Sequence, residues 1–187
     1  MTHIAASLPR DLPASVCVAV HLPASRRSHL ADILSRAGGP PAIDPVDGQP
    51  LERGFIYVAP PDHHLMIDDS HMRLWRGPKE NLQRPAVNAL FRSAAVSHGS
   101  RAIGVVLSGS LEDGATGLWW IKRYGGVAVV QDPADAKFPS MPQQALSTVD
   151  VDFSLPVARM PALLIHLVTG REGDMAAAAR AVSGEDR

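Results

Sequence analysis

The sequence contains very little cysteine, since Cys17 is the only one in 187 residues. One cysteine cannot form an internal disulfide, and this fits a reducing compartment such as the cytoplasm. The neighbouring Val16 and Val18 favour a buried thiol. A nucleophilic thiol needs partial exposure and positively charged surroundings, so we expect Cys17 to be inert.

Long hydrophobic runs and a surplus of basic charge are also absent. No apolar run approaches the ~20 residues that are needed to span a bilayer. Residues 1–13 (MTHIAASLPRDLP) lack the basic segment and the long apolar segment of a secretory signal. The net charge of -1 is not that of a general nucleic-acid binder. The sequence therefore predicts neither membrane insertion nor a nucleic-acid partner. It predicts a cytoplasmic location.

Apolar, β-branched runs alternate with segments of helical spacing along most of the chain. The spacing predicts strands at 15–21, 54–60, 102–107 and 127–130. It predicts helices at 28–36, from Pro85 onward, at 114–124, 142–147 and 156–168. Residues 64–68 and 72–75 form a predicted hairpin. This order indicates an α/β fold with a doubly wound, mostly parallel sheet and an inserted antiparallel hairpin. One α/β domain is expected over 1–170, followed by a polar, alanine-rich tail over 171–187.

His21 ends the first predicted strand and is followed two residues later by Pro23. Open α/β sheets place their chemistry just beyond the carboxyl ends of their strands. His21 therefore lies where a general base would lie. A partly buried, hydrogen-bonded histidine without a catalytic role is the alternative.

Asp113 follows another apolar strand, in a loop of small residues ahead of a predicted helix. It could cap that helix, or it could orient a histidine. A phosphate-binding turn is a weaker alternative, because the loop has no Walker lysine. His21 and Asp113 share one edge of the predicted sheet. A carboxylate bonded to one ring nitrogen would leave the other free to take a proton from a hydroxyl.

The adjacent His63 and His64 could in principle bind a metal ion. Neighbouring residues of a strand point to opposite faces, so joint coordination is not expected. The sequence predicts no metal site and no cofactor.

Five stretches of the chain resemble the catalytic domain of CheB-type protein-glutamate methylesterases. They are AVHLP (19–23), RGFIYVAPPDHHLMI (53–67), the region of GPKENLQRPAVNALFRSAA (77–95), GVVLSGSLEDGATGL (104–118) and GGVAVVQDPADAKFPSMPQQAL (125–146). The resemblance implies a doubly wound α/β fold and a serine–histidine–aspartate triad. His21 matches the family histidine in its His-x-Pro context, and Asp113 matches the aspartate of its Asp-Gly-Ala loop.

The resemblance also shows departures from the family pattern. The family serine lies in a Gly-x-Ser-x-Gly-Gly turn upstream of the histidine, and neither this turn nor its strand is found after Met1. We therefore expect an N-terminally truncated domain, through a misassigned start or a real loss. Ser110 stands where the family usually has methionine, and Asn88 where it commonly has aspartate. The sequence also shows no receiver domain.

The resemblance implies hydrolysis of glutamate γ-methyl esters on methyl-accepting chemotaxis receptors, giving glutamate and methanol. Those receptors are the implied partners, together with a methyltransferase as a further candidate. The alternative is a catalytically inactive module that binds a receptor or another partner. A nucleotide-binding α/β domain that uses the 108–117 loop is a third, more distant hypothesis.

Overall fold

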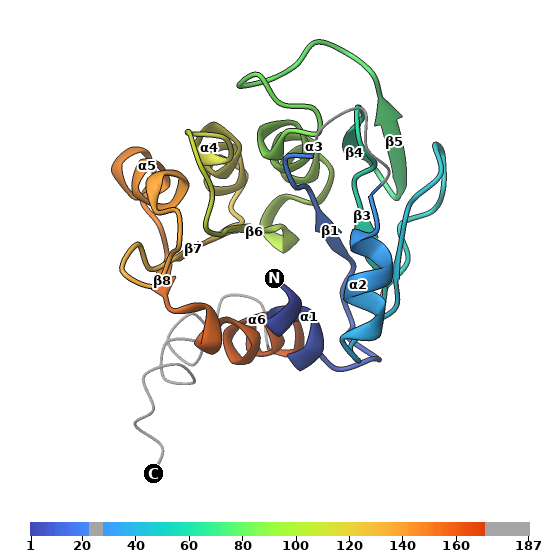
Figure 1. Cartoon of the computed structure of the whole chain (residues 1–187), viewed down its shortest axis with the longest axis horizontal. Helices are drawn as coiled ribbons and strands as arrows, with labels where there is room; N and C mark the ends of the chain where they lie inside the picture. Colours follow the sequence, from blue (N-terminus) through green and yellow to red (C-terminus); the bar gives the residue numbers. More distant parts are fainter. Residues whose placement is uncertain (23–27, 171–187) are drawn as a thin grey trace.

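A computed structural model describes residues 1–22 and 28–170 and has the expected α/β architecture (Figure 1). The strands are β1 (Val16–Val18), β2 (Ala42–Ile43), β3 (Ile56–Val58), β4 (His64–Asp68), β5 (His71–Trp75), β6 (Ile103–Val106), β7 (Val127–Gln131) and β8 (Phe153–Leu155). The α-helices are α1 (Thr2–Ser7), α2 (Leu30–Arg36), α3 (Val87–His98), α4 (Ala115–Arg123), α5 (Ser140–Thr148) and α6 (Met160–Thr169). Short 3₁₀ turns lie at Gly99–Arg101 and Val157–Arg159.

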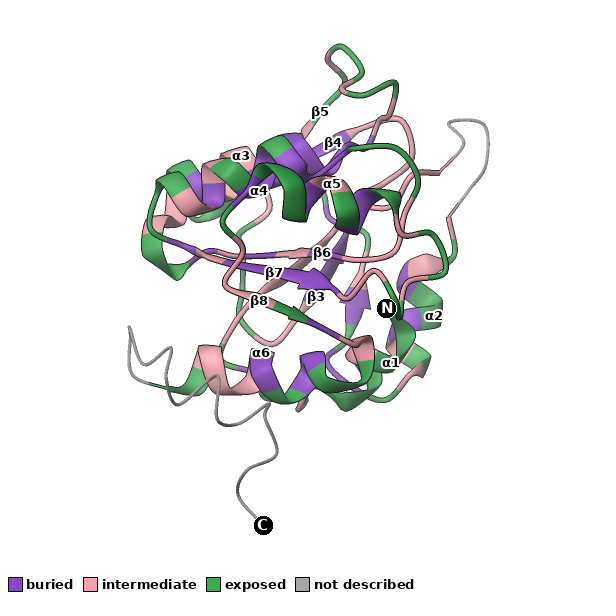
Figure 2. Cartoon of the chain, turned by 90° about the vertical axis from the view of Figure 1, so that its left-hand side faces the viewer, coloured by how far each residue is buried: buried purple, intermediate pink, exposed green. Residues whose placement is uncertain are grey.

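Helices cover both faces of the strand layer, as a doubly wound fold requires. In Figure 2, α3, α4 and α5 lie above the strands, and α1 and α6 lie below them. Helix α2 packs in one apolar cluster with α1, β2 and β3. This arrangement lets strands such as β7 read as almost continuous apolar sequence, because both faces of the strand are buried.

The parallel strands form two sheets rather than the one sheet that the sequence predicts. One sheet has the order β1-β3-β2 and the other β6-β7-β8, and all of these pairings are parallel. The predicted hairpin is present as the antiparallel pair β4–β5, in which Asp68 lies opposite His71. Within the described residues, β1 and β6 are therefore edge strands of two separate sheets.

The apolar core follows the same division. The largest cluster lies on the side of α3, α4 and α5 and includes Tyr57, Leu118 and Val130. The opposite face carries two separate clusters, one around Leu34 and Ile56 and another around Val129, Met160 and Leu163. Because the two lower clusters remain separate, the core is continuous on one face and interrupted on the other.

The remaining differences from the sequence predictions concern short elements and helix ends. Strands β2 and β8 were not predicted, because two or three residues are too few to show a periodic pattern. Helix α5 begins at Ser140, since a proline such as Pro142 is tolerated in a first turn. Helix α6 begins at Met160, after the 3₁₀ turn, rather than at 156.

Two further sequence predictions concern the C-terminal tail and the absence of a membrane-spanning segment. The predicted tail at 171–187 lies outside the described residues. Over the part of the chain that the structure describes, no helix combines the length and apolar character needed to cross a bilayer.

We predict that Leu118→Ala lowers the free energy of unfolding by about 2–5 kcal/mol, since it leaves a cavity between α4 and the strands. Leu118 is 0% exposed in the largest core cluster. The matched control is Val46→Ala, at a side chain that is 69% exposed, and we expect it to change stability by less than about 0.5 kcal/mol. Urea denaturation followed by circular dichroism measures both, and equal effects would contradict the assigned core.

Candidate functional site

The structure brings His21 and Asp113 together, although 92 residues separate them in the sequence. The Nε2 atom of His21 lies 2.8 Å from Oδ2 of Asp113. His21 follows β1, and Asp113 lies in the loop between β6 and α4. Their contact therefore joins the carboxyl ends of the two edge strands.

Asp113 is held at the N-terminus of α3. Its Oδ2 accepts a hydrogen bond from the backbone N–H of Val87 at 2.6 Å, and its Oδ1 accepts one from the backbone N–H of Asn88 at 3.1 Å. The side-chain amide of Asn81 donates to the same Oδ1 at 3.4 Å. The first N–H groups of a helix lack partners within the helix and carry the positive end of its dipole. They are therefore natural donors to a buried carboxylate.

These contacts keep Asp113 ionised although it is almost fully buried. Burial by itself would raise the pKa of Asp113, because it disfavours the charged form. The hydrogen bonds from His21, Val87 and Asn88 outweigh burial and hold the pKa below its ordinary value of 3.8.

Asn88 fixes the loop that carries Asp113. Its side-chain Oδ1 accepts hydrogen bonds from the backbone N–H of Gly114 at 3.0 Å and of Gly117 at 2.7 Å. Gly114 has φ of +100°, a left-handed conformation that favours glycine. Asn88 and Gly114 together fix the conformation of the loop after β6, and this loop places the side chain of Asp113 against His21.

Asp113 does not cap the helix that follows it. Helix α4 begins after Gly114 and has no side-chain cap, whereas Asp113 bonds to the first turn of α3. Of the roles weighed from the sequence, the hydrogen bond to His21 is the one that the geometry supports.

One ring nitrogen of His21 is hydrogen-bonded to Asp113, and the other ring nitrogen is available to exchange a proton. Its side chain is 23% exposed, whereas that of Asp113 is 0% exposed. With Nε2 bonded to the carboxylate, Nδ1 is the nitrogen that can exchange a proton. Among the described residues, Asp113 supplies the only side-chain hydrogen bond to His21. A serine hydroxyl at hydrogen-bond distance from this histidine is therefore not present in the described part of the chain.

Cys17 and the two adjacent histidines are not part of this site. Burial raises the pKa of the Cys17 thiol to about 12, so it stays protonated at neutral pH. His64 uses Nε2 on the Pro78 carbonyl and Nδ1 on the Ala86 backbone N–H, and His63 contacts the Pro61 carbonyl. Both ring nitrogens of His64 are thus engaged in positioning the start of α3.

Comparisons with known proteins show the family to which this chain belongs. The family model described as CheB methylesterase matches residues 1–164. This chain belongs to the CheB methylesterase family. The crystal structure of the Thermotoga maritima CheB methylesterase catalytic domain matches with a TM-score of 0.85 and 31% identity, covering 89% of this chain and 90% of that one.

Curated relatives carry the same family name. A relative from Leptospira interrogans, provisionally named protein-glutamate methylesterase/protein-glutamine glutaminase, is 33% identical over 168 residues, covering 89% of this chain and 87% of the relative. A protein-glutamate methylesterase/protein-glutamine glutaminase 2 from Anaeromyxobacter dehalogenans is 36% identical over 160 residues. The match covers 86% of this chain but 47% of that relative, so this chain spans about half of the longer family member.

Sequence reasoning singled out His21 and Asp113 but gave no positioning role to Asn88 or to the first turn of α3. The sequence showed only that Asn88 departs from the family's usual aspartate. Its hydrogen bonds to Gly114 and Gly117 join residues 26 and 29 positions apart, and no local spacing reveals them.

We predict that Asn88→Ala destabilises the domain by about 1–3 kcal/mol, because two buried backbone donors lose their acceptor. Asn88→Asp retains an acceptor oxygen at the same place, and we expect a smaller loss. Urea denaturation of the two variants measures the difference. An alanine variant as stable as the aspartate variant would contradict this role.

We also predict that the stabilisation provided by Asp113 disappears in acid. A carboxylate whose folded pKa is lowered stabilises the fold above its ordinary pKa, and this contribution is lost as the pH falls through the folded value. Asp113→Asn should thus be less stable than the wild type by about 1–3 kcal/mol at neutral pH. The difference should shrink below about pH 4. Urea denaturation curves of both proteins over a pH series measure this difference in the free energy of unfolding. A difference that grows in acid would contradict the lowered pKa of Asp113.

Proposed function

We propose that this chain provides the histidine and aspartate of a protein-glutamate methylesterase site, acting on glutamate γ-methyl esters. The observation that carries the proposal is the 2.8 Å contact between His21 and the buried Asp113 at the end of the two edge strands. The family membership supports an ester as the substrate. The proposed partners are the methyl-accepting chemotaxis receptors that the resemblance implies. The proposed location of the reaction is the cytoplasm.

In the proposed reaction, His21 acts as the general base and Asp113 as the residue that orients it. His21 Nδ1 takes a proton from an attacking hydroxyl, whose oxygen bonds to the ester carbonyl carbon. The imidazolium then gives this proton to the departing methoxide, which leaves as methanol. Water repeats the attack on the acyl intermediate and releases the glutamate carboxylate. The negative charge of Asp113 stabilises the imidazolium in both steps.

The attacking hydroxyl is proposed to come from a serine outside the described residues. The resemblance implies such a serine, and His21 has no hydroxyl partner among residues 1–22 and 28–170. Relatives are also named protein-glutamine glutaminase. An amide and an ester of the same γ-carboxyl present the same carbonyl carbon, so glutamine side chains are a second proposed substrate class.

A binding module without catalytic activity is the alternative function. The same observation favours it, since a histidine without a hydroxyl partner does not by itself form a nucleophilic site. Such a module would bind a methylated receptor, or a methyltransferase that works on it, without releasing methanol.

We predict slow methanol release from a methyl-labelled receptor by the 187-residue chain, with His21 acting on water. His21→Ala should lower this rate by at least about 10²-fold, because general-base catalysis contributes 10²–10⁴-fold. His63→Ala is the matched control, since His63 is also partly exposed but contacts only a nearby carbonyl. Gas chromatography of the released methanol measures all three proteins.

The other outcomes of this assay separate the two functions. Turnover that survives His21→Ala would contradict the assigned base. Absence of turnover in the wild type, with receptor binding retained in a pull-down, would favour the binding module.

A further inference from the structure

Two leucines near the candidate site combine a strained backbone with an exposed side chain. Leu82 has φ of +65° and Leu111 has φ of +69°, and the two residues are 80% and 54% exposed. A left-handed φ is disfavoured for residues with a Cβ atom and is usually adopted by glycine or asparagine. Neither burial of the side chain nor the backbone conformation therefore explains a leucine at these two positions.

Leu82 lies at the tip of a tight turn that also carries Asn81. Glu80 and Gln83 close this turn with two backbone hydrogen bonds, of 3.1 Å and 2.8 Å. Both residues between them have positive φ, as in a type I′ turn, for which Asn-Gly is the favoured sequence. Leucine thus stands where glycine would suit the backbone best. Because the side-chain amide of Asn81 donates to Asp113 Oδ1, Leu82 lies one residue from a contact of the site.

A third exposed apolar residue lies in the loop between β7 and α5. Phe138 is 51% exposed, and its carbonyl accepts a hydrogen bond from the backbone N–H of Gly109 at 2.9 Å. This bond fixes Phe138 against the loop between β6 and α4, which carries Leu111. We call Leu82, Leu111 and Phe138 the apolar rim.

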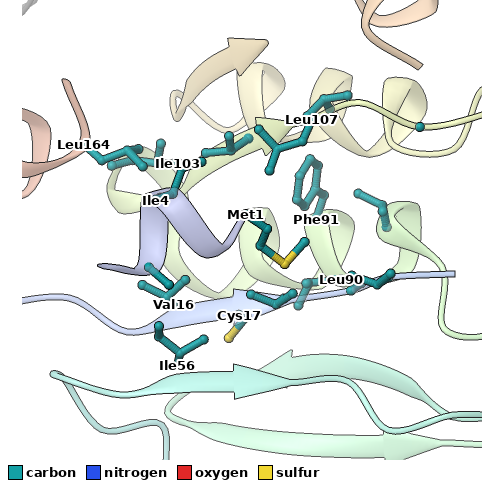
Figure 3. A pocket seen from close by; sticks show the side chains of 18 of the residues that line it. Met1, Ile4, Val16, Cys17, Ile56, Leu90, Phe91, Ile103, Leu107 and Leu164 are labelled. Carbon is teal, nitrogen blue, oxygen red and sulfur yellow. The ribbon is translucent and has the colours of Figure 1, made fainter. Parts of the chain in front are cut away.

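The apolar rim lies beside the histidine–aspartate pair. Its three loops precede α3, α4 and α5, and these helices lie side by side in Figure 1. Leu111 and Phe138 line the same cavity as His21. Other walls of this cavity are apolar side chains such as Phe91 and Leu107 (Figure 3). The exposed side chains of the rim therefore gather where a substrate would approach His21.

Exposed apolar residues elsewhere in the chain do not share the strain of the two leucines. Val96 on α3 and Trp119 on α4 are exposed, and isolated apolar side chains on a surface are ordinary. Neither of them has a positive φ. Over the described part of the chain, the other non-glycine residues with positive φ are polar, namely Asp62, Asp69 and Asn81. Strain and an exposed apolar side chain therefore coincide only at Leu82 and Leu111 among the described residues.

The extent of the rim indicates the kind of molecule that it fits. Packed helices lie about 8–10 Å apart, so a row across the ends of three helices extends about 16–20 Å. A free glutamate methyl ester is much shorter than this row. Contact along the whole row needs a polypeptide, and burial of the rim is favourable where that polypeptide presents apolar side chains.

We propose that the apolar rim binds the protein segment that carries the reactive glutamyl group, through apolar side chains on both sides of that residue. The segment lies across the N-terminal ends of α3, α4 and α5, and its γ-ester points toward His21. This role rests on the proposed function, because that function supplies the ester. The rim itself rests on the position, exposure and strain of its residues. Backbone strain of this kind persists at binding sites, where it serves a contact with the ligand.

The test measures the binding of two peptides to the full chain by fluorescence anisotropy. Each peptide carries an amino-terminal fluorescein and one central glutamyl γ-methyl ester, with alanine and lysine at most other positions. In the first peptide, leucine stands four residues before and four residues after the ester. This spacing places the three side chains on one face of either a strand or a helix. In the second peptide, serine replaces both leucines.

We expect the wild type to bind the leucine peptide at least about tenfold more tightly than the serine peptide, since apolar surface leaves water on binding. In Leu82→Gly and in Leu111→Gly, this preference should fall to about threefold or less. Val96→Ala is the matched control, since Val96 is exposed near the C-terminal end of α3, and it should keep the full preference. Equal binding of the two peptides by the wild type, or an unchanged preference in both glycine variants, would overturn the proposal.

The stability of the same glycine variants gives a readout that a purely structural role would not produce. Glycine adopts a left-handed φ without a steric penalty, so Leu82→Gly and Leu111→Gly should keep or raise the midpoint of urea denaturation. Weaker binding would then accompany an equal or higher stability. A midpoint that falls by more than about 0.3 M in both variants would mean that the leucines serve the fold, and would overturn their assignment to a substrate.

Methanol release from the two peptides separates this proposal from the proposed hydrolysis. Preferential binding of the leucine peptide without methanol release would support the apolar rim and contradict the hydrolysis. Equal binding of the two peptides, with equal methanol release from both, would support the hydrolysis and overturn the rim.

Discussion

The arrangement of the candidate site depends on the carboxylate of Asp113. This group joins three parts of the chain: the loop after β6 that carries it, the first turn of α3, and His21 after β1. An isolated buried carboxylate would be strongly disfavoured, but the hydrogen bonds that reach Asp113 keep its pKa low. The same bonds that offset the cost of burial therefore fix where His21 lies and which of its nitrogens remains free.

The hydrogen bonds of Asp113 also explain why His21 and Asp113 stay together although the parallel strands form two sheets. Asn88 ties the loop of Asp113 to α3, and α3 packs its other side against the main core. His64 supports the same helix start through the Ala86 backbone N–H. The site is thus anchored on the continuous face of the core, and the interruption lies on the opposite face, between the two smaller clusters.

Much of the fold was predictable from residue patterns, and part of the site was. The β-branched run ending at Val130 and the apolar spacing around Leu118 identify a strand and a helix, because burial of both dictates their composition. His21 and Asp113 were predictable as neighbours because both follow parallel strands. The roles of Asn88 and of the first turn of α3 were not, since they depend on contacts across 25–29 residues. Residue patterns alone did not show the division into two sheets, because a strand sequence does not reveal whether both of its edges are paired.

The central claim is that Asp113 sets the proton distribution on the His21 ring. Nitrogen-15 NMR of the histidine rings tests it directly, independently of any substrate. The account predicts that neutral His21 carries its proton on Nε2, with a strongly downfield proton signal that is lost in Asp113→Asn. A neutral His21 protonated on Nδ1, or an Nε2 proton signal unchanged in Asp113→Asn, would contradict it.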